Sequence, residues 1–516
     1  MDRFVCKEDY PVVETKAGKL RGYVWNDTFI FKGIKYADAE RFMRPHEIAP
    51  WEGVKDAQSY GYVCPLMEQD HPSMELMVPH MYWPMDEHCQ YLNVWTQSID
   101  PQAKRPVMVW LHGGGFFAGS SIEQLAYDGE NMSKYGDVVV VSLNHRLNIL
   151  GYLDLSPFGE QYAESANVGS LDMIMALQWI RDNIAGFGGD PDNVTLFGQS
   201  GGGAKVWTLM QMPEADGLFH RGIVESGVYA VGGMGDVEEQ DGTQIVGAML
   251  EELGLTAAEV GKLETLPYAA LAEAYRKVAP AIAAQGGYVG NKPHIGSLYA
   301  GDPVRHGFRE HAKQIPLLIG TALGEFDFLP PVAKKWELTR EQVLEKAGKR
   351  YGDKAEQVLA LFEQAYPGKC LLDAMVVDTV FRAPTIAFIR ERAKSAESVT
   401  YSYQFTYEFP IYNGKVAWHC SEIPFVFHNI DKVPICNKDE GSLRLQEQIC
   451  GAWINFAREG SPNIEGVEWP CCQVGDEAVM ILDETCEIRH NVDHALIELL
   501  ESLPKPGEEE RGAVQH

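Results

Sequence analysis

The stretch Val194-Thr195-Leu196-Phe197-Gly198-Gln199-Ser200-Gly201-Gly202 carries the strongest fold signal in this chain of 516 residues. A short β-branched and apolar run leads directly into a serine with glycines on both sides, and a helical pattern follows as far as Met212. This order predicts a G-x-S-x-G elbow, in which a strained strand-to-helix turn exposes the serine hydroxyl. Ser200 is therefore the candidate nucleophile, because the helix behind it also directs backbone N–H groups towards developing negative charge.

A second glycine-rich turn lies upstream, where the apolar run of residues 107–111 leads into His112-Gly113-Gly114-Gly115-Phe116. Three glycines after a buried strand allow several backbone N–H groups to point to one place, as a tetrahedral acyl-transfer intermediate requires. The run lacks both the Lys-Ser/Thr ending of a phosphate loop and the G-x-G-x-x-G spacing of a dinucleotide site. Together with the serine elbow, it indicates an oxyanion-binding loop.

Short apolar and β-branched runs recur along the chain, with helical patterns between them. Such an alternation is typical of strands that are buried on both faces of a largely parallel sheet. The predicted fold class is therefore α/β, with a mostly parallel central sheet and helices on both of its faces. The predicted strands are residues 107–111, 138–143, 194–197, 222–224, 316–319 and 399–405.

Apolar residues at three- and four-residue steps predict the helices. They repeat between Leu171 and Ile184, and this pattern ends at a turn rich in glycine. Residues 242–277 are rich in Ala, Leu and Glu, which predicts helices inserted between two strands of the sheet. Residues 353–366 and 443–458 are predicted to be helical as well.

The whole chain, residues 1–516, is expected to form a single α/β domain with helical insertions. Its length would also allow about three domains, but the strand and helix patterns run on without a linker. Only residues 504–516 (PKPGEEERGAVQH) have the composition of a flexible tail.

The charge balance is strongly acidic, with 44 Lys and Arg against 73 Asp and Glu and a formal net charge of −29. This argues against nucleic acid as a partner, since binding a polyanion needs basic patches. It also disfavours an anionic membrane surface, and we interpret the charge as an aid to solubility.

The first ten residues, MDRFVCKEDY, have no apolar run behind their charges, so we expect no signal peptide. No apolar stretch approaches the length of a membrane span. With ten cysteines in 516 residues, the expected location is cytoplasmic. The oligomeric state leaves no mark on the sequence.

In α/β folds with a serine elbow, the acid and then the histidine follow the nucleophile along the chain. His419 comes after a strand-like run and a loop and just before an apolar segment, which is where the base is expected. Glu325 lies just beyond the predicted strand 316–319 and is the candidate acid. Asp327 lies two residues further on, and spacing alone does not exclude it.

Several motifs in a fixed order resemble the type-B carboxylesterase family, which contains bacterial p-nitrobenzyl esterases and the cholinesterases. The resemblance extends from about residue 18 to residue 483. The residues that carry it are Phe31-Lys32-Gly33-Ile34-Lys35-Tyr36-Ala37, Cys89-Gln90-Tyr91-Leu92-Asn93-Val94-Trp95, the His112 loop, Asn144-His145-Arg146-Leu147, Phe187-Gly188-Gly189-Asp190-Pro191, the serine elbow, and Trp453-Ile454-Asn455-Phe456-Ala457.

The resemblance implies an α/β-hydrolase fold and hydrolysis of carboxylic esters through an acyl-enzyme. By position, Ser200 matches the family nucleophile and His419 matches the base. Glu325 matches the acid, which favours it over Asp327. Ser226 resembles a serine that supports the acid.

The resemblance also assigns the oxyanion donors, which match the backbone N–H groups of Gly114, Gly115 and Gly201. It implies no metal and no organic cofactor. Phe116, Phe117 and Trp207 are candidates for the acyl or alcohol pocket, although aromatic residues beside glycine loops are equally common in a core.

The sequence departs from the family pattern at several positions. Gln199 replaces the usual Glu before the nucleophile, which removes a negative charge and argues against a cationic choline ester. Gly201 replaces an Ala, Phe326 replaces the Gly after the acid, and His88 replaces an Asp. Cys64 and Cys89 resemble the pair that forms a disulfide in secreted members; in a reducing compartment we expect two neighbouring thiols.

The expected substrate is a small to medium, uncharged carboxylic ester. A triad of this kind also suits an amide, a carbamate, a carbonate or a lactone. A non-catalytic binding protein on the same fold is a less favoured alternative, since nucleophile, acid and base are all present. A lipase would need a large apolar lid, and residues 74–85 (MELMVPHMYWPM) are the one candidate for it.

Overall fold

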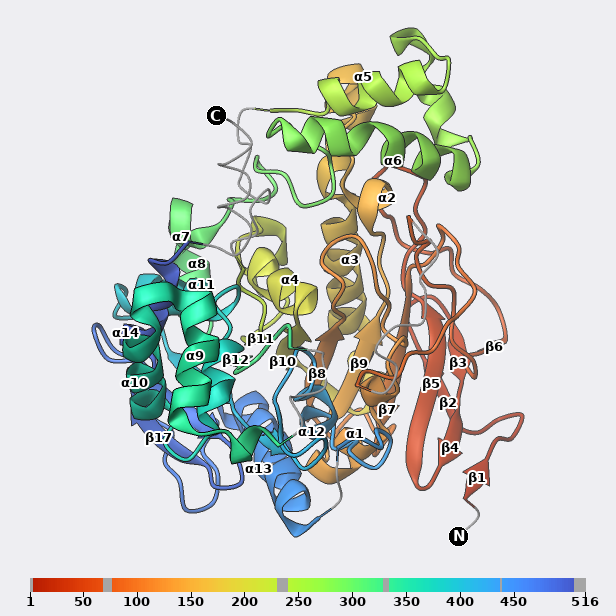
Figure 1. Ribbon diagram of the computed structural model, residues 1–516. Coiled ribbons are helices and arrows are strands. Elements are labelled where there is room, and N and C mark those ends of the chain that lie inside the picture. Colours follow the sequence, from red (N-terminus) through yellow and green to blue (C-terminus); the bar gives the residue numbers. More distant parts are fainter. Residues whose placement is uncertain (1–2, 68–76, 230–239, 328–333, 437–438, 505–516) are drawn as a thin grey trace.

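A mostly parallel sheet forms the centre of the protein (Figure 1). The computed structural model describes residues 3–67, 77–229, 240–327, 334–436 and 439–504. Within these residues the sheet has 12 strands, in the order β1-β4-β5-β7-β9-β8-β10-β11-β12-β13-β16-β17. Neighbouring strands from β9 to β16 in this order are parallel, and the strands at both edges are antiparallel.

The parallel strands are β8 (Arg105–Leu111), β9 (Val139–Leu143), β10 (Gly189–Gln199), β11 (Arg221–Glu225), β12 (Leu317–Ala322), β13 (Thr400–Phe405) and β16 (Ala478–Leu482). The antiparallel strands are β1 (Phe4–Val5), β4 (Tyr23–Trp25), β5 (Thr28–Lys35), β7 (Tyr91–Thr96) and β17 (Glu487–His490). Two small sheets lie outside, formed by β2 (Val12–Glu14), β3 (Lys19–Arg21) and β6 (Val54–Asp56), and by β14 (Glu408–Phe409) and β15 (Lys415–Val416).

Alternate residues of each central strand face opposite sides of the sheet. In β8, Val107, Val109 and Leu111 join one buried cluster, while Met108 and Trp110 join the other. The first cluster includes residues of α3 (Val168–Asn183), α4 (Gly201–Met210) and α11 (Arg382–Ala393). The second includes residues of α1 (Glu130–Gly136), α12 (Ile423–Val426) and α13 (Glu440–Glu459). The predicted α/β class, with helices on both faces of the sheet, is confirmed.

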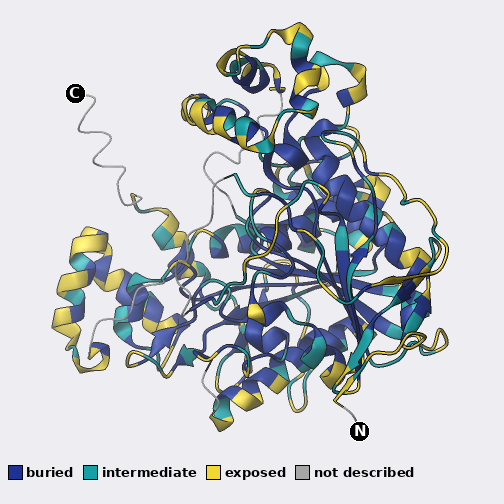
Figure 2. Ribbon diagram, turned by 90° about the vertical axis from the view of Figure 1, so that its right-hand side faces the viewer, coloured by how far each residue is buried: buried dark blue, intermediate teal, exposed yellow. Residues whose placement is uncertain are grey.

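The predicted helical insertion forms a separate mass beyond the carboxyl ends of the strands (Figure 1). It consists of α5 (Thr243–Glu252), a 3₁₀ segment (Ala257–Glu264) and α6 (Tyr268–Ala284), which packs on α2 (Asn148–Tyr152). Its own buried cluster includes Ile245, Val246 and Leu271 together with Ile149 and Leu153 of the α2 region. Figure 2 shows that its inner side is buried while its outer side is exposed.

A second helical group covers the β17 end of the sheet. It contains α9 (Arg340–Tyr351), α10 (Ala355–Ala365) and α14 (His494–Glu501), and the short helices α7 (Pro303–His306) and α8 (Glu310–Gln314) lie near α11. The predicted helices at 353–366 and 443–458 correspond to α10 and α13. Local apolar spacing was enough to locate them, because each has one long buried stripe.

Two predictions fall partly on residues outside the described ranges. Residues 74–76 of the candidate lid are not described; in the rest of it Met77 and Val78 are buried, whereas Tyr82, Trp83 and Met85 are exposed. The candidate tail lies outside the described ranges from residue 505 onwards. The organisation of residues 1–516 as a single domain also stays a prediction.

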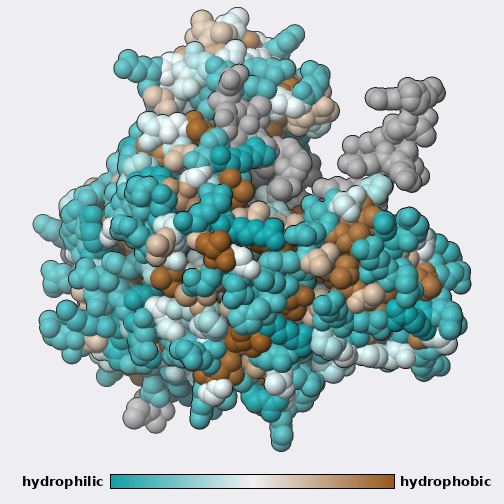
Figure 3. Space-filling view, turned by 90° about the vertical axis from the view of Figure 1, so that its left-hand side faces the viewer, coloured by the Kyte–Doolittle hydropathy of each residue, from teal (hydrophilic) through white to brown (hydrophobic). Residues whose placement is uncertain are grey.

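Cys64 and Cys89 are buried neighbours and both are free thiols. Burial and the adjacent Cys64 thiol raise the pKa of Cys89 well above its usual range. In the described ranges, no helix combines the length and the apolar character that crossing a bilayer requires. On the face shown in Figure 3, hydrophobic side chains form small separate patches on a largely hydrophilic surface.

A buried ion pair fastens the loop after β9 to α3. Arg146 and Asp172 make a bidentate contact with 2.7 and 2.9 Å bonds, and both side chains are almost completely buried. The Arg146 backbone N–H also donates to this carboxylate. Removing the negative charge would leave the guanidinium buried without a counter-ion.

We therefore expect Asp172→Asn to lower the free energy of unfolding by about 3–5 kcal/mol, measured by urea denaturation. The matched control is Asp182→Asn on the same helix, since Asp182 pairs with a half-exposed Arg181. This control should cost less than about 1 kcal/mol. Equal losses in the two variants would contradict the special weight given to the buried pair.

Candidate active site

Three of the candidate residues follow the ends of neighbouring strands. Ser200 comes directly after β10, Ser226 directly after β11, and Glu325 three residues after β12. These strands are adjacent and parallel, so their carboxyl ends lie at one edge of the sheet. Polar side chains at this edge are placed together by the sheet itself, and ligands of open α/β sheets bind there.

Ser200 sits on a strained turn between β10 and α4. Its φ of 58° and ψ of −126° lie in a region that residues with a side chain rarely adopt. Its N–H donates to the Glu225 carbonyl at 2.8 Å, which fixes the turn against β11. Glycine at 202 is required by packing, because a Cβ there would lie 1.9 Å from the Leu111 carbonyl oxygen.

The structure brings Glu325 and His419 into direct contact. The Glu325 carboxylate lies 2.6 Å from His419 Nδ1, and the His419 backbone N–H donates to the Glu325 carbonyl, also at 2.6 Å. The other carboxylate oxygen accepts from the Ser226 hydroxyl at 2.5 Å and from the Ala322 N–H at 2.7 Å. Glu325 is completely buried, and these donors compensate for the loss of water around its charge.

Asp327, the alternative acid, faces a different partner. Its carboxylate pairs with Lys415, whose side chain is completely buried. Although Glu325 and Asp327 are only two positions apart in the turn, their carboxylates contact different partners, His419 and Lys415. No contact joins Asp327 to His419 in the described structure.

The loop after β8 approaches the first turn of α4. Gly114 and Gly115 both have positive φ values, 81° and 63°, and within the described residues neither of their N–H groups reaches an acceptor. A Cβ added to Gly201 would lie 2.2 Å from the Gly115 nitrogen, so the two backbones abut. The Asn148 N–H donates to the Phe116 carbonyl at 2.8 Å and holds the far end of the loop.

Gln199 and Cys420 lie against His419. Gln199 Nε2 is 3.2 Å from His419 Nδ1, and the Cys420 thiol donates to Gln199 Oε1 at 3.2 Å. Cys420 has a φ of 73°, a conformation that favours glycine. A neutral amide thus occupies the position beside the imidazole where a carboxylate would add negative charge.

The comparison with known families agrees with this architecture, since the model described as "Carboxylesterase family" matches residues 9–498. The chain belongs to the carboxylesterase family. Para-nitrobenzyl esterase of Bacillus subtilis is 34% identical to it over 503 residues, covering 93% of this chain and 96% of that protein. Phenmedipham hydrolase of Pseudarthrobacter oxydans is 31% identical over 525 residues, covering 95% and 99%.

Among solved structures, the chain is similar to an esterase from Clostridium hathewayi that can hydrolyze aliphatic aromatic polyesters. The two are 53% identical, with a TM-score of 0.93 and coverage of 97% of this chain and 99% of that one. The protein is therefore a carboxylesterase with the α/β-hydrolase fold. This finding favours an enzyme of ester hydrolysis over a non-catalytic binding protein.

An aromatic cluster that the sequence analysis missed surrounds the imidazole of this carboxylesterase. Phe381 stacks on His419 with ring centroids 4.9 Å apart, and Phe326 stacks on both of them, at 5.6 Å from Phe381 and 5.5 Å from His419. Tyr229 contacts the edge of Phe381 at 5.5 Å. Phe326 is 56% exposed. Phe326 could have been placed near the imidazole from its position directly after Glu325. Phe381 is distant from both Glu325 and His419 in the sequence, so no local pattern indicated it.

The three aromatic residues proposed for the pocket differ in their surroundings. Phe116 is buried against Tyr152, whereas Phe117 is exposed and its ring lies over Gly115. Trp207 is half-buried, and its indole N–H donates to the Gly227 carbonyl at 3.0 Å. A role for them in the pocket of the carboxylesterase stays a prediction.

Further buried carboxyl groups lie around the acid. Asp378 accepts backbone N–H bonds from residues 380–382, and burial, followed by the charge of Glu325, raises its pKa. Burial raises the pKa of Glu225 to about 8, although Trp453 donates to it at 2.7 Å. Burial thus favours the neutral form of both carboxyl groups.

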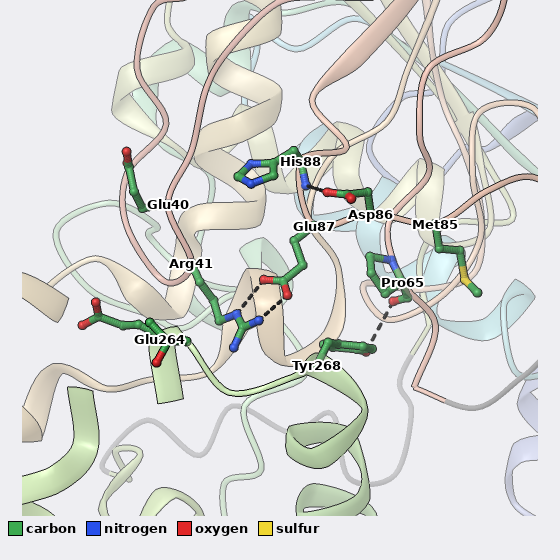
Figure 4. A pocket seen from close by; sticks show the side chains of 10 residues that line it. Glu40, Arg41, Pro65, Met85, Asp86, Glu87, His88, Glu264 and Tyr268 are labelled. Atoms are coloured by element: carbon green, nitrogen blue, oxygen red, sulfur yellow. Dashed lines mark hydrogen bonds and ion pairs between the residues drawn. The ribbon is translucent and has the colours of Figure 1, made fainter. Parts of the chain in front are cut away.

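A cavity of about 700 Å³ lies elsewhere, between the loop before β7 and the start of α6 (Figure 4). Arg41 forms an ion pair with Glu87 on its wall, and none of the residues that line it belongs to the candidate triad. In the described part of the chain, no group of His, Cys, Asp and Glu side chains is arranged to hold a metal ion.

The contact between Ser226 and Glu325 gives a test of how the acid is supported. We expect Ser226→Ala to lower kcat for p-nitrophenyl butyrate about ten- to hundredfold, since a hydrogen bond to a charged group contributes about 1.5–3 kcal/mol. The matched control is Ser402→Ala, which removes an equally buried 2.6 Å bond to Glu477. That variant should keep its kcat, and a similar fall in both would show a general loss of stability instead.

Proposed function

We propose that this carboxylesterase cleaves its ester with Ser200 as nucleophile, His419 as base and Glu325 as the acid that orients the base. The observation that carries the proposal is the 2.6 Å contact between Glu325 and His419 Nδ1. Because Nδ1 faces the carboxylate, Nε2, which lies 3.4 Å from the Gln199 amide nitrogen, is the imidazole nitrogen that would take a hydroxyl proton. The strained turn at Ser200 supports its role as the nucleophile.

In the first half of the reaction, His419 takes the Ser200 proton as the hydroxyl oxygen attacks the ester carbonyl. The N–H groups of Gly114, Gly115 and Gly201 hold the resulting oxyanion, and losing one such donor typically costs about 3 kcal/mol. His419 then gives its proton to the leaving alcohol. Water then attacks the acyl-enzyme by the same steps, with His419 again as the base, and the carboxylic acid product is released.

The substrate is proposed to be uncharged. Gln199 places a neutral amide beside His419, whereas the matching position in the resembled family usually carries a negative charge that would favour a cation. All ten cysteines are free thiols, which supports a reducing, cytoplasmic location. This location is part of the proposal. Amides, carbamates and lactones are the alternatives that a substrate panel separates.

Esters with a planar aromatic group are the proposed preference within this class. Phe326 presents an exposed ring that is stacked beside the base, and rings of this kind attract other aromatic groups by offset stacking. The similar esterase that can hydrolyze aliphatic aromatic polyesters supports this preference.

The first test compares three variants by hydrolysis of p-nitrophenyl acetate, butyrate and octanoate. Ser200→Ala should abolish turnover and labelling by a fluorophosphonate probe, and Glu325→Gln should lower kcat by about 10⁴, because the imidazole is then held in the wrong tautomer. Asp327→Asn is the matched control, two residues further along the same turn. It should keep most of its kcat while its Tm falls, since the buried Lys415 loses its ion pair with Asp327.

The second test concerns the aromatic preference. Phe326→Ala should lower kcat/KM for ethyl benzoate about three- to tenfold relative to ethyl butyrate, because one aromatic contact contributes about 0.5–1.5 kcal/mol. Phe4→Ala is the control, since Phe4 is also 56% exposed but lies on β1. An equal loss on both esters would rule out an aromatic subsite at Phe326.

A further inference from the structure

A buried lysine lies on α4 directly behind the loop that carries Gly114 and Gly115. Lys205 is completely buried, and its ammonium group donates to the His112 carbonyl at 2.8 Å. No carboxylate contacts it in the described structure. Since the neighbouring positions of α4 are apolar or small, a lysine on this face of the helix is unexpected.

The other buried lysines in the described ranges are arranged differently. Lys335 contacts the Asp373 carboxylate at 2.8 Å, and Lys415 pairs with Asp327. Lys205 has only a neutral acceptor, so burial dominates and lowers its pKa to about 7, partly offset by Glu123 and Cys64. A lysine in this environment destabilises the fold at neutral pH, because it must enter an apolar interior.

The carbonyl that Lys205 holds belongs to the first residue of the loop. At the other end of the loop, the Asn148 N–H holds the Phe116 carbonyl. The N–H groups of Gly114 and Gly115, which lie between these two points, have no acceptor within the described residues. The peptide units that carry them are held as well: the Gly113 carbonyl lies 2.9 Å from His112 Nδ1, and the Gly114 carbonyl accepts from the Ala118 N–H at 2.9 Å. The direction of the two N–H groups thus depends on His112, and on the ends of the loop that hold it in place.

The other titratable groups that face Lys205 do not replace this bond. His112 stacks on His145 with ring centroids 5.3 Å apart. Burial, followed by the nearby charge of Lys205, lowers the pKa of both imidazoles well below the usual range. Glu123 and Cys64 act on Lys205 through space, and neither accepts a hydrogen bond from it.

We propose that Lys205 is a positioning residue for ester hydrolysis: by holding the His112 carbonyl, it aims the Gly114 and Gly115 N–H groups at the oxyanion. The inference rests on the proposed function, because it assumes that this loop binds the oxyanion. It explains why a destabilising buried amine is kept at this position. Stability and catalysis are expected to respond to its removal in opposite directions.

The test is Lys205→Met, which keeps most of the side-chain volume and removes the donor. We expect kcat for p-nitrophenyl butyrate to fall about ten- to hundredfold, since small misplacements in a site have effects of this size. KM should change less than twofold. The inhibition constant of an alkyl trifluoromethyl ketone, which forms an oxyanion on the enzyme, should rise by the same factor as kcat/KM falls.

The Tm of Lys205→Met at pH 7 should equal or exceed that of the wild type. Its advantage should shrink as the pH rises from 7 to 10. The reason is that the unfolded lysine keeps its proton up to a pH of about 10, whereas burial lowers the pKa of the folded one to about 7. The wild type therefore releases a proton on folding over this range, and its stability rises with pH. This readout reports the lowered pKa of the buried amine independently of any measurement of catalysis.

Lys335→Met is the matched control, because it removes a buried lysine that has a carboxylate partner. It should lower the Tm, by leaving Asp373 unpaired, and leave kcat unchanged. An unchanged kcat in Lys205→Met, or a kcat that falls only together with the Tm, would overturn the inference. Ser200→Ala separates the two levels: if it still hydrolysed the ester, the proposed function itself would fail.

Discussion

The parallel pairing of β10, β11 and β12 is the constraint on which the proposed active site depends. Because the three strands run side by side in the same direction, Ser200, Ser226 and Glu325 emerge at one edge of the sheet. The contact between Ser226 and Glu325, and through Glu325 the contact to His419, follow from that placement. The loop after β13 only has to bring one histidine across a short distance.

The site is also a region of stored strain and unusual burial. Ser200, Ser226 and Cys420 all have positive φ values, and Asp378, Glu225 and Lys205 are buried titratable groups with shifted pKa values. Such features persist only where the surrounding fold determines them strongly. Here the two buried clusters that pack on the two faces of the sheet stabilise the surrounding fold.

The sequence was most informative where the signal is local. The elbow at Ser200, the buried strands and the amphipathic helices α3 and α13 all follow from residues that are close in the chain. Glu325 and Asp327 show the limit: their spacing could not separate them, and only the fold directs one to His419 and the other to Lys415. Phe381 and Lys205 were missed because their partners come from distant segments. Lys205 did leave a trace, as a cation on an apolar helix face.

The helical insertion is connected to the proposed catalytic centre through α2. Ile149 and Leu153 belong to the buried cluster of α5 and α6, while the adjacent Asn148 holds the Phe116 carbonyl at the end of the glycine loop. The short α2 region therefore packs against the insertion and also holds one end of the glycine loop by a hydrogen bond. Substitutions on the outer side of the insertion are therefore expected to leave the glycine loop undisturbed, whereas substitutions that alter its packing on α2 are expected to displace the loop.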